Sequence, residues 1–122
     1  MGGQYFFTID DVFVQGSVLH LCESKHSKNA LLPSGDDIKD GLLKLMLYNN
    51  LAKIKGYDRF KVVLRLTSGV LDSRFSLPSE NLCDFIAQHK FSNTQITMLK
   101  LLNLECKSNN FEIWINNDSF FV

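Results

Sequence analysis

Two β-prone runs near the start of the chain, separated by a three-residue turn, constrain the fold more than any other feature. Residues 5–14 are rich in aromatic and β-branched side chains, and residues 18–24 continue in the same style. Gly16, in the turn between them, can supply the positive φ that a tight connection needs. The sequence therefore predicts a β-hairpin, followed by a polar loop over residues 25–33.

A capped helix and further strands are expected after the hairpin. Ser34 is a typical N-cap, acidic residues follow it directly, and apolar residues at helical spacing extend to about Leu51. The next part of the pattern predicts a strand over 60–66 and a loop or short extended piece over 67–78. A short helix begun by Ser79, a helix capped by Asn93 or Thr94, and a strand over 111–115 are expected after it. The expected fold class is α/β, with a mixed central sheet flanked by helices in the order β-β-α-β-α-α-β.

Composition limits the classes of protein that the chain can represent. Its 122 residues, 45% of them hydrophobic, are enough for one domain over 1–122 with a core of its own. Thirteen basic and thirteen acidic residues give a net charge of zero, so any contact with nucleic acid must come from a local patch. Three widely spaced cysteines show no metal-binding motif, which favours reduced, buried thiols and a cytoplasmic location.

Charged residues gather where the predicted hairpin would bring its two strands together. Asp10 and Asp11 lie within the first run, although aspartate is uncommon in strands, and Glu23 and Lys25 are spaced two apart at the end of the second. Residues two apart in a strand share a face, so Glu23 and Lys25 are expected side by side. Carboxylates at one sheet edge suit Mg²⁺, and a nearby ammonium group can orient or deprotonate water and offset charge on phosphorus.

This pattern resembles the PD-(D/E)xK nucleases, which have a restriction-endonuclease-like fold. The residues that carry the resemblance are an acidic residue in one strand, Glu23-Ser24-Lys25 at the end of the next, and the helix and strand that follow, within residues 5–67. The segment resembles the catalytic part of a type II restriction endonuclease. The resemblance implies Mg²⁺-dependent hydrolysis of phosphodiester bonds in double-stranded DNA.

The resemblance also implies a role for each residue of the motif. Glu23 would be a metal ligand, Lys25 the catalytic lysine, and the backbone carbonyl of Ser24 a further metal contact. The family's aspartate would be either Asp11 or Asp10, with the spacing slightly in favour of Asp11. Only one of the two can join Glu23, since neighbouring residues in a strand point to opposite faces.

The sequence also departs from the family pattern. The family's leading core helix is missing before the hairpin, so we expect the chain to be a fragment of a longer enzyme. Its expected partner is the missing N-terminal part, and a homodimer is a second option. Such a fragment is expected to be inactive if it depends on that part. Two alternatives stay open: an inactive nuclease-fold module for dimerisation or DNA positioning, and an unrelated α/β interaction domain.

Several residues near the motif have an ordinary interpretation as well. His26 and Lys39 can approach DNA phosphates. The plainer expectation for His26 is a loop histidine without a role. For Lys39, and for Lys44 as well, it is a lysine on the solvent-facing side of a helix. Glu23 and Lys25 can likewise be a solvated pair. If carboxylates crowd together without metal, neutralising Glu23 is expected to raise stability.

Overall fold

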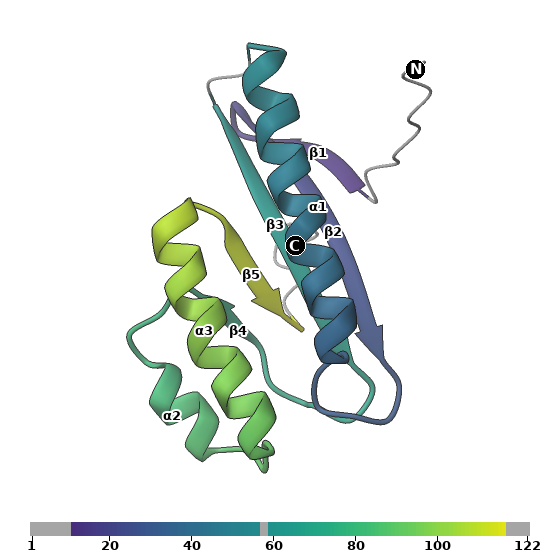
Figure 1. The fold of residues 1–122 in the computed structure, drawn as a ribbon, viewed down its shortest axis with the longest axis vertical. Helices are drawn as coiled ribbons and strands as arrows, with labels where there is room; N and C mark the ends of the chain where they lie inside the picture. The colour runs from purple at the N-terminus through teal and green to yellow at the C-terminus, as the bar shows by residue number, and fades with distance from the viewer. Residues whose placement is uncertain (1–10, 57–58, 117–122) are drawn as a thin grey trace.

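The computed structural model describes residues 11–56 and 59–116, which form a five-stranded sheet and three helices (Figure 1). The elements follow the chain in this order: β1 (Asp11–Gln15), β2 (Val18–Ser27), α1 (Gly35–Ile54), β3 (Phe60–Ser68), β4 (Phe75–Leu77), α2 (Leu82–Ala87), α3 (Asn93–Asn109) and β5 (Glu112–Ile115).

The sheet is mixed, and its strands lie in the order β1-β2-β3-β5-β4. The three central strands, β2, β3 and β5, are parallel, whereas β1 and β4 are antiparallel edge strands. The 20-residue helix α1 connects the parallel neighbours β2 and β3. This arrangement confirms the expected α/β class with a mixed sheet and helices.

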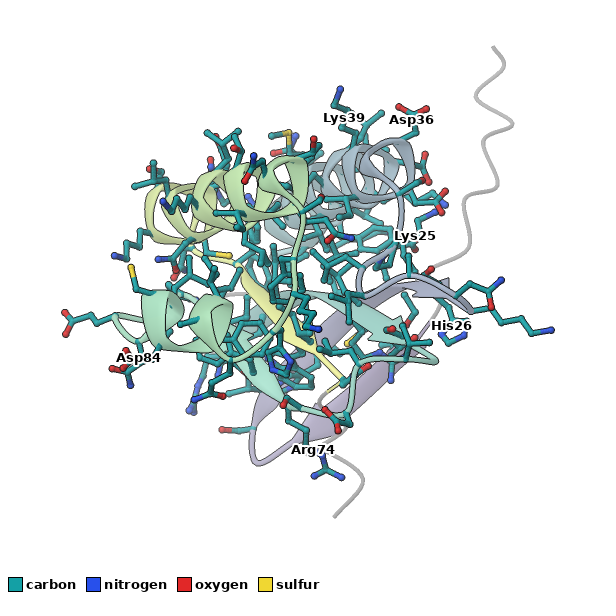
Figure 2. All side chains as sticks on the ribbon, turned by 90° about the horizontal axis from the view of Figure 1, so that it is seen from below. Lys25, His26, Asp36, Lys39, Arg74 and Asp84 are labelled. Carbon is teal, nitrogen blue, oxygen red and sulfur yellow. The ribbon has the colours of Figure 1, made fainter. Side chains whose placement is uncertain are left out.

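Helices α1 and α3 lie on the same face of the sheet, as Figure 2 shows from one end. Most buried apolar residues belong to one cluster that joins this face to the helices, with Ile38 and Leu45 from α1 and Leu99 and Leu102 from α3. A smaller cluster contains Cys22, Val63 and Trp114 and lies apart from the first. Strand alternation assigns this second cluster to the opposite face.

The local signals for the hairpin and for α1 are confirmed. Gly16 adopts a φ of 67°, a conformation that favours glycine, in the turn between β1 and β2. The side chain of Ser34 accepts a hydrogen bond of 3.1 Å from the backbone N–H of Asp37 and so caps α1. For α3 the expected cap was wrong by one or two residues, because Ser92 caps the helix through a reciprocal pair of hydrogen bonds with Gln95.

Two strands differ from the expectation. β2 continues to Ser27, so Lys25 and His26 belong to the strand and the polar loop begins later than predicted. The cause is parallel pairing with β3, which runs without interruption to Ser27 and Ser68. The segment expected as a loop or short extended piece contains β4, which pairs with β5.

Packing divides the apolar residues of α1 and α3 in a way that their spacing does not show. On α1, Ile38 and Leu45 are buried, whereas Met46 is 49% exposed. The apolar residues of α3 are likewise divided: Leu99 and Leu102 are buried, whereas Leu101 and Leu104 are more than half exposed.

A glycine fixes how closely α1 lies over the sheet. An ideal Cβ at Gly41 would lie 2.6 Å from Cδ1 of Leu64, a fully buried residue of β3. The helix therefore approaches β3 at a point where any side chain on the helix would force the buried Leu64 to shift. Gly41 follows Asp40 directly, so this close approach also sets the distance of the neighbouring helix residues from β2 and β3.

Candidate functional site

Glu23 is a buried charged residue on the face of β2 that α1 covers. Its side chain lies among apolar core residues, and Glu23 is only 1% exposed. Lys25, two residues further along the strand, shares this face, and its Nζ lies 3.6 Å from Oε2 of Glu23. The prediction that these two residues lie side by side is confirmed, but Glu23 is not part of a solvated pair.

Helix α1 supplies the other partners of Glu23. The hydroxyl of Tyr48 donates a hydrogen bond of 2.8 Å to Oε1, and Nζ of Lys44 donates one of 3.0 Å to Oε2. The two carboxylate oxygens therefore differ: Oε1 is held by a buried, neutral donor, and Oε2 faces cations. A buried carboxylate needs such partners, since an unpaired charge in the interior is very costly.

Asp40 extends the arrangement toward solvent. Nζ of Lys25 donates a hydrogen bond of 2.7 Å to Oδ2 of Asp40, and Nζ of Lys44 lies 3.4 Å from the same oxygen. Two carboxylates and two ammonium groups thus alternate in one group, which we call the acid–lysine cluster: Glu23, Lys25, Asp40 and Lys44. Its formal charge is zero, and burial decreases from Glu23 to Asp40, whose side chain is 48% exposed.

Proton affinities in the cluster follow from these contacts. The hydrogen bond with Asp40 raises the pKa of Lys25, and the hydrogen bond with Glu23 raises the pKa of Lys44. The hydrogen bond from Lys25 lowers the pKa of Asp40. Both lysines are therefore ammonium groups near neutral pH, which suits Lys25 to stabilising negative charge rather than to removing a proton from water.

The register of the hairpin bears on the predicted aspartate. Asp11 is paired with Cys22, not with Glu23. The side chain of Asp11 and the whole of Asp10 lie outside the described residues, so the prediction that one of them joins Glu23 stays a prediction.

Ser24 and His26 occupy the alternate positions of β2. The side chain of Ser24 accepts a hydrogen bond of 2.9 Å from Nε of Arg65 on β3. Nδ1 of His26 lies 2.7 Å from the hydroxyl oxygen of Thr67. Figure 2 shows Lys25 pointing toward α1 and His26 away from it, so the two residues do not face one common space.

On α1, sequence reasoning favoured an ordinary role for both Lys39 and Lys44. Lys39 is exposed and points away from the sheet (Figure 2), as expected for a solvent-facing lysine. Lys44 differs from the expectation, because it bonds the buried Glu23.

Asp40 and Tyr48 were not singled out from the sequence. A signal was available: Asp40, Lys44 and Tyr48 are spaced four apart, which places them on one side of a helix. That side contacts the strand that carries Glu23.

The described residues contain no group of three histidine, cysteine or acidic side chains arranged to hold a metal ion. They do contain hard oxygen ligands, the carboxylate of Glu23 and the backbone carbonyl of Ser24. Mg²⁺ is commonly bound by only one or two carboxylates and completes its shell with water and phosphate oxygens. These ligand types suit Mg²⁺, but the described residues supply only one of the carboxylates, so a Mg²⁺ site completed by Asp10 or Asp11 stays a prediction.

Comparisons with known proteins identify no family for this chain. The sequence matches no protein-family model and no curated protein, and no solved structure matches the fold. Among the described helices, none is long and apolar enough to cross a membrane.

Proposed function

We propose that the chain is the catalytic part of a Mg²⁺-dependent DNA endonuclease related to type II restriction enzymes. The observation that carries the proposal is the pairing of Glu23 and Lys25 on one strand, with 3.6 Å between carboxylate oxygen and ammonium nitrogen. The order β1, β2, α1, β3, with β3 parallel to β2, also agrees with the restriction-endonuclease-like core. A cytoplasmic location belongs to the same proposal.

Each residue of the motif has a role in this mechanism. Glu23 and one of Asp10 and Asp11 would hold Mg²⁺, with the carbonyl of Ser24 as a further contact. When bound, Mg²⁺ supplies a Lewis acid for the phosphate and an activated water. Lys25, kept as an ammonium group by Asp40, holds the attacking water and stabilises the charge that develops on the phosphate oxygens. His26 and Lys39 stay candidates for contacts with the DNA backbone.

Cleavage of supercoiled plasmid in Mg²⁺ or Mn²⁺ tests the proposal. We expect nicking by the wild-type chain, loss of Mn²⁺ binding in Glu23→Ala, and loss of cleavage with retained Mn²⁺ binding in Lys25→Ala. Lys90→Ala removes an exposed lysine between α2 and α3 and is the matched control, with unchanged cleavage.

One observation favours the alternative of an inactive nuclease-fold module. Every charge in the acid–lysine cluster already has a partner of opposite sign, so the cluster is also a satisfactory structural network. Mn²⁺ binding without cleavage would support this module. If no Mn²⁺ binds and both variants behave as wild type in the plasmid assay, the result favours an unrelated α/β interaction domain.

A further inference from the structure

We propose that Lys44 is an exchangeable counter-ion of Glu23, which leaves the carboxylate when a divalent cation binds there. The inference rests on the proposed function, because it takes Glu23 as a metal ligand. It adds a residue of α1 that controls how tightly the metal is held.

The first step is the asymmetry of the Glu23 carboxylate. Tyr48 is fully buried and donates to Oε1, so this oxygen has a fixed partner. Oε2 instead faces two ammonium groups, that of Lys44 at 3.0 Å and that of Lys25 at 3.6 Å. Positive charge is therefore already collected at Oε2, the oxygen to which an incoming cation would bind.

The second step is the choice between the two lysines. Lys25 is held by Asp40 at 2.7 Å, and its side chain is 17% exposed. The side chain of Lys44 is 37% exposed, and its shortest ionic contact is with Glu23. Lys44 can therefore move toward solvent more easily than Lys25.

The third step is an alternative partner for Lys44. Asp40 lies one helical turn before it, and the nitrogen–oxygen distance is already 3.4 Å. A small rotation of the lysine side chain can shorten this contact while it breaks the bond to Glu23. The ammonium group thus keeps a carboxylate partner after displacement, which lowers the cost of exchange.

Competition between an ammonium group and a divalent cation for one oxygen predicts a distinctive variant. In Lys44→Met the stem of the side chain is nearly retained, but Glu23 loses its closest cation. We expect Mn²⁺ to bind Lys44→Met about tenfold more tightly than wild type in calorimetric titration. In metal-free buffer the same variant melts at a lower temperature than wild type, and saturating Mn²⁺ raises its melting temperature more than that of wild type.

Lys53→Met is the matched control. Lys53 lies in the last turn of the same helix, is exposed, and carries the same charge. The Lys53→Met variant therefore measures how much cation affinity rises when any positive charge is removed from the chain. Lys44→Gln repeats the measurement if the methionine variant does not fold.

The outcomes separate the inference from the proposed function. Tighter binding in Lys44→Met, but not in Lys53→Met, supports exchange. Equal or weaker binding in both Lys44 variants, with clear binding by wild type, overturns the inference and leaves the nuclease proposal standing. An absence of Mn²⁺ binding in wild type and in all variants overturns both.

Discussion

The hydroxyl of Tyr48 donates a hydrogen bond of 2.8 Å to Oε1 of Glu23, and both residues are buried. This contact links the centre of α1 to the centre of β2. It fixes one oxygen of a carboxylate that the core would otherwise exclude and leaves the other to the lysines. The contact is therefore important both for stability and for the orientation of the site.

Tyr48→Phe removes this hydrogen bond and keeps the aromatic ring of the side chain. A hydrogen bond to a charged group contributes about 2 kcal/mol, so we expect the free energy of unfolding to fall by about that amount. Urea denaturation with EDTA present measures it. In a Glu23→Gln background the same substitution is expected to cost clearly less, because the acceptor is no longer charged. Equal costs in the two backgrounds would show that the loss does not come from this pair.

Glu23→Ala is expected to destabilise the metal-free protein. This is the opposite of the expectation from the sequence, which rests on repulsion among carboxylates alone. In the structure Glu23 is surrounded by Lys44, Lys25 and Tyr48, and its removal takes away the acceptor of the Lys44 and Tyr48 hydrogen bonds and a countercharge of Lys25. Loss of one partner of a buried pair costs about 3 kcal/mol.

Chemical denaturation of Glu23→Ala in EDTA checks this value. Glu80→Ala, which removes an exposed carboxylate near α2, is the control and is expected to change stability by less than about 0.5 kcal/mol. A Glu23→Ala protein as stable as wild type would mean that the buried network contributes no net stability.

The sequence predicts the elements whose signals are local. The turn at Gly16 and the cap at Ser34 depend on neighbouring residues, so the hairpin and the start of α1 could be placed. The length of β2 could not, since its last residues are held by pairing with β3, about 40 positions away. β4 is likewise defined only by its partner β5.

The candidate site also combines a part that local sequence signals predict with a part that depends on distant residues. The strand spacing of Glu23 and Lys25 predicts their shared face, because alternation is a local property. The roles of Lys44 and Tyr48 depend on how α1 lies over β2. That placement depends in turn on Gly41, whose missing side chain lets the helix approach Leu64. A glycine inside a helix gives no indication from sequence alone of the neighbour that requires it.

The register of the hairpin predicts which aspartate serves the site. Asp11 is paired with Cys22 and not with Glu23, so we predict that Asp10 is the partner of Glu23. We expect Asp10→Asn to weaken Mn²⁺ binding at least tenfold more than Asp11→Asn, about 1.4 kcal/mol. Titration calorimetry of the two variants makes the comparison, with each variant the control for the other. Equal affinities would exclude a dedicated aspartate ligand.

The three cysteines are expected to differ in reactivity. Cys22 and Cys106 are buried, but Cys83 is exposed, which departs from the expectation that all three thiols are buried. Burial also raises the pKa of Cys106 to about 12, so its thiolate is scarce at neutral pH. At pH 8 one thiol per chain should react rapidly with a disulfide reagent, and in Cys83→Ser none should. Rapid reaction of a second thiol in the folded protein would contradict the burial of Cys22 and Cys106.

The stability contributed by the acid–lysine cluster is expected to be constant near neutral pH and to decline on both sides. The folded-state pKa of Lys25 is raised above its ordinary value of 10.5, so its contribution is present below that pH and is lost as the pH rises through the higher value. The pKa of Asp40 is lowered below 3.8, so its contribution is present above that pH and is lost as the pH falls through the lower value.

Lys25→Met isolates this dependence, because it removes the ammonium group that bonds Asp40. We expect its melting temperature to lie roughly 3 °C below that of wild type between about pH 5 and pH 10. The difference should shrink below pH 3.8, where Asp40 begins to lose its charge, and above pH 10.5, where Lys25 does. Thermal unfolding across the range measures it, with Lys53→Met as the control that shows no such profile. A difference that changes steeply between pH 5 and pH 9 would assign the effect to another titrating group, since neither member of this ion pair changes its charge in that interval.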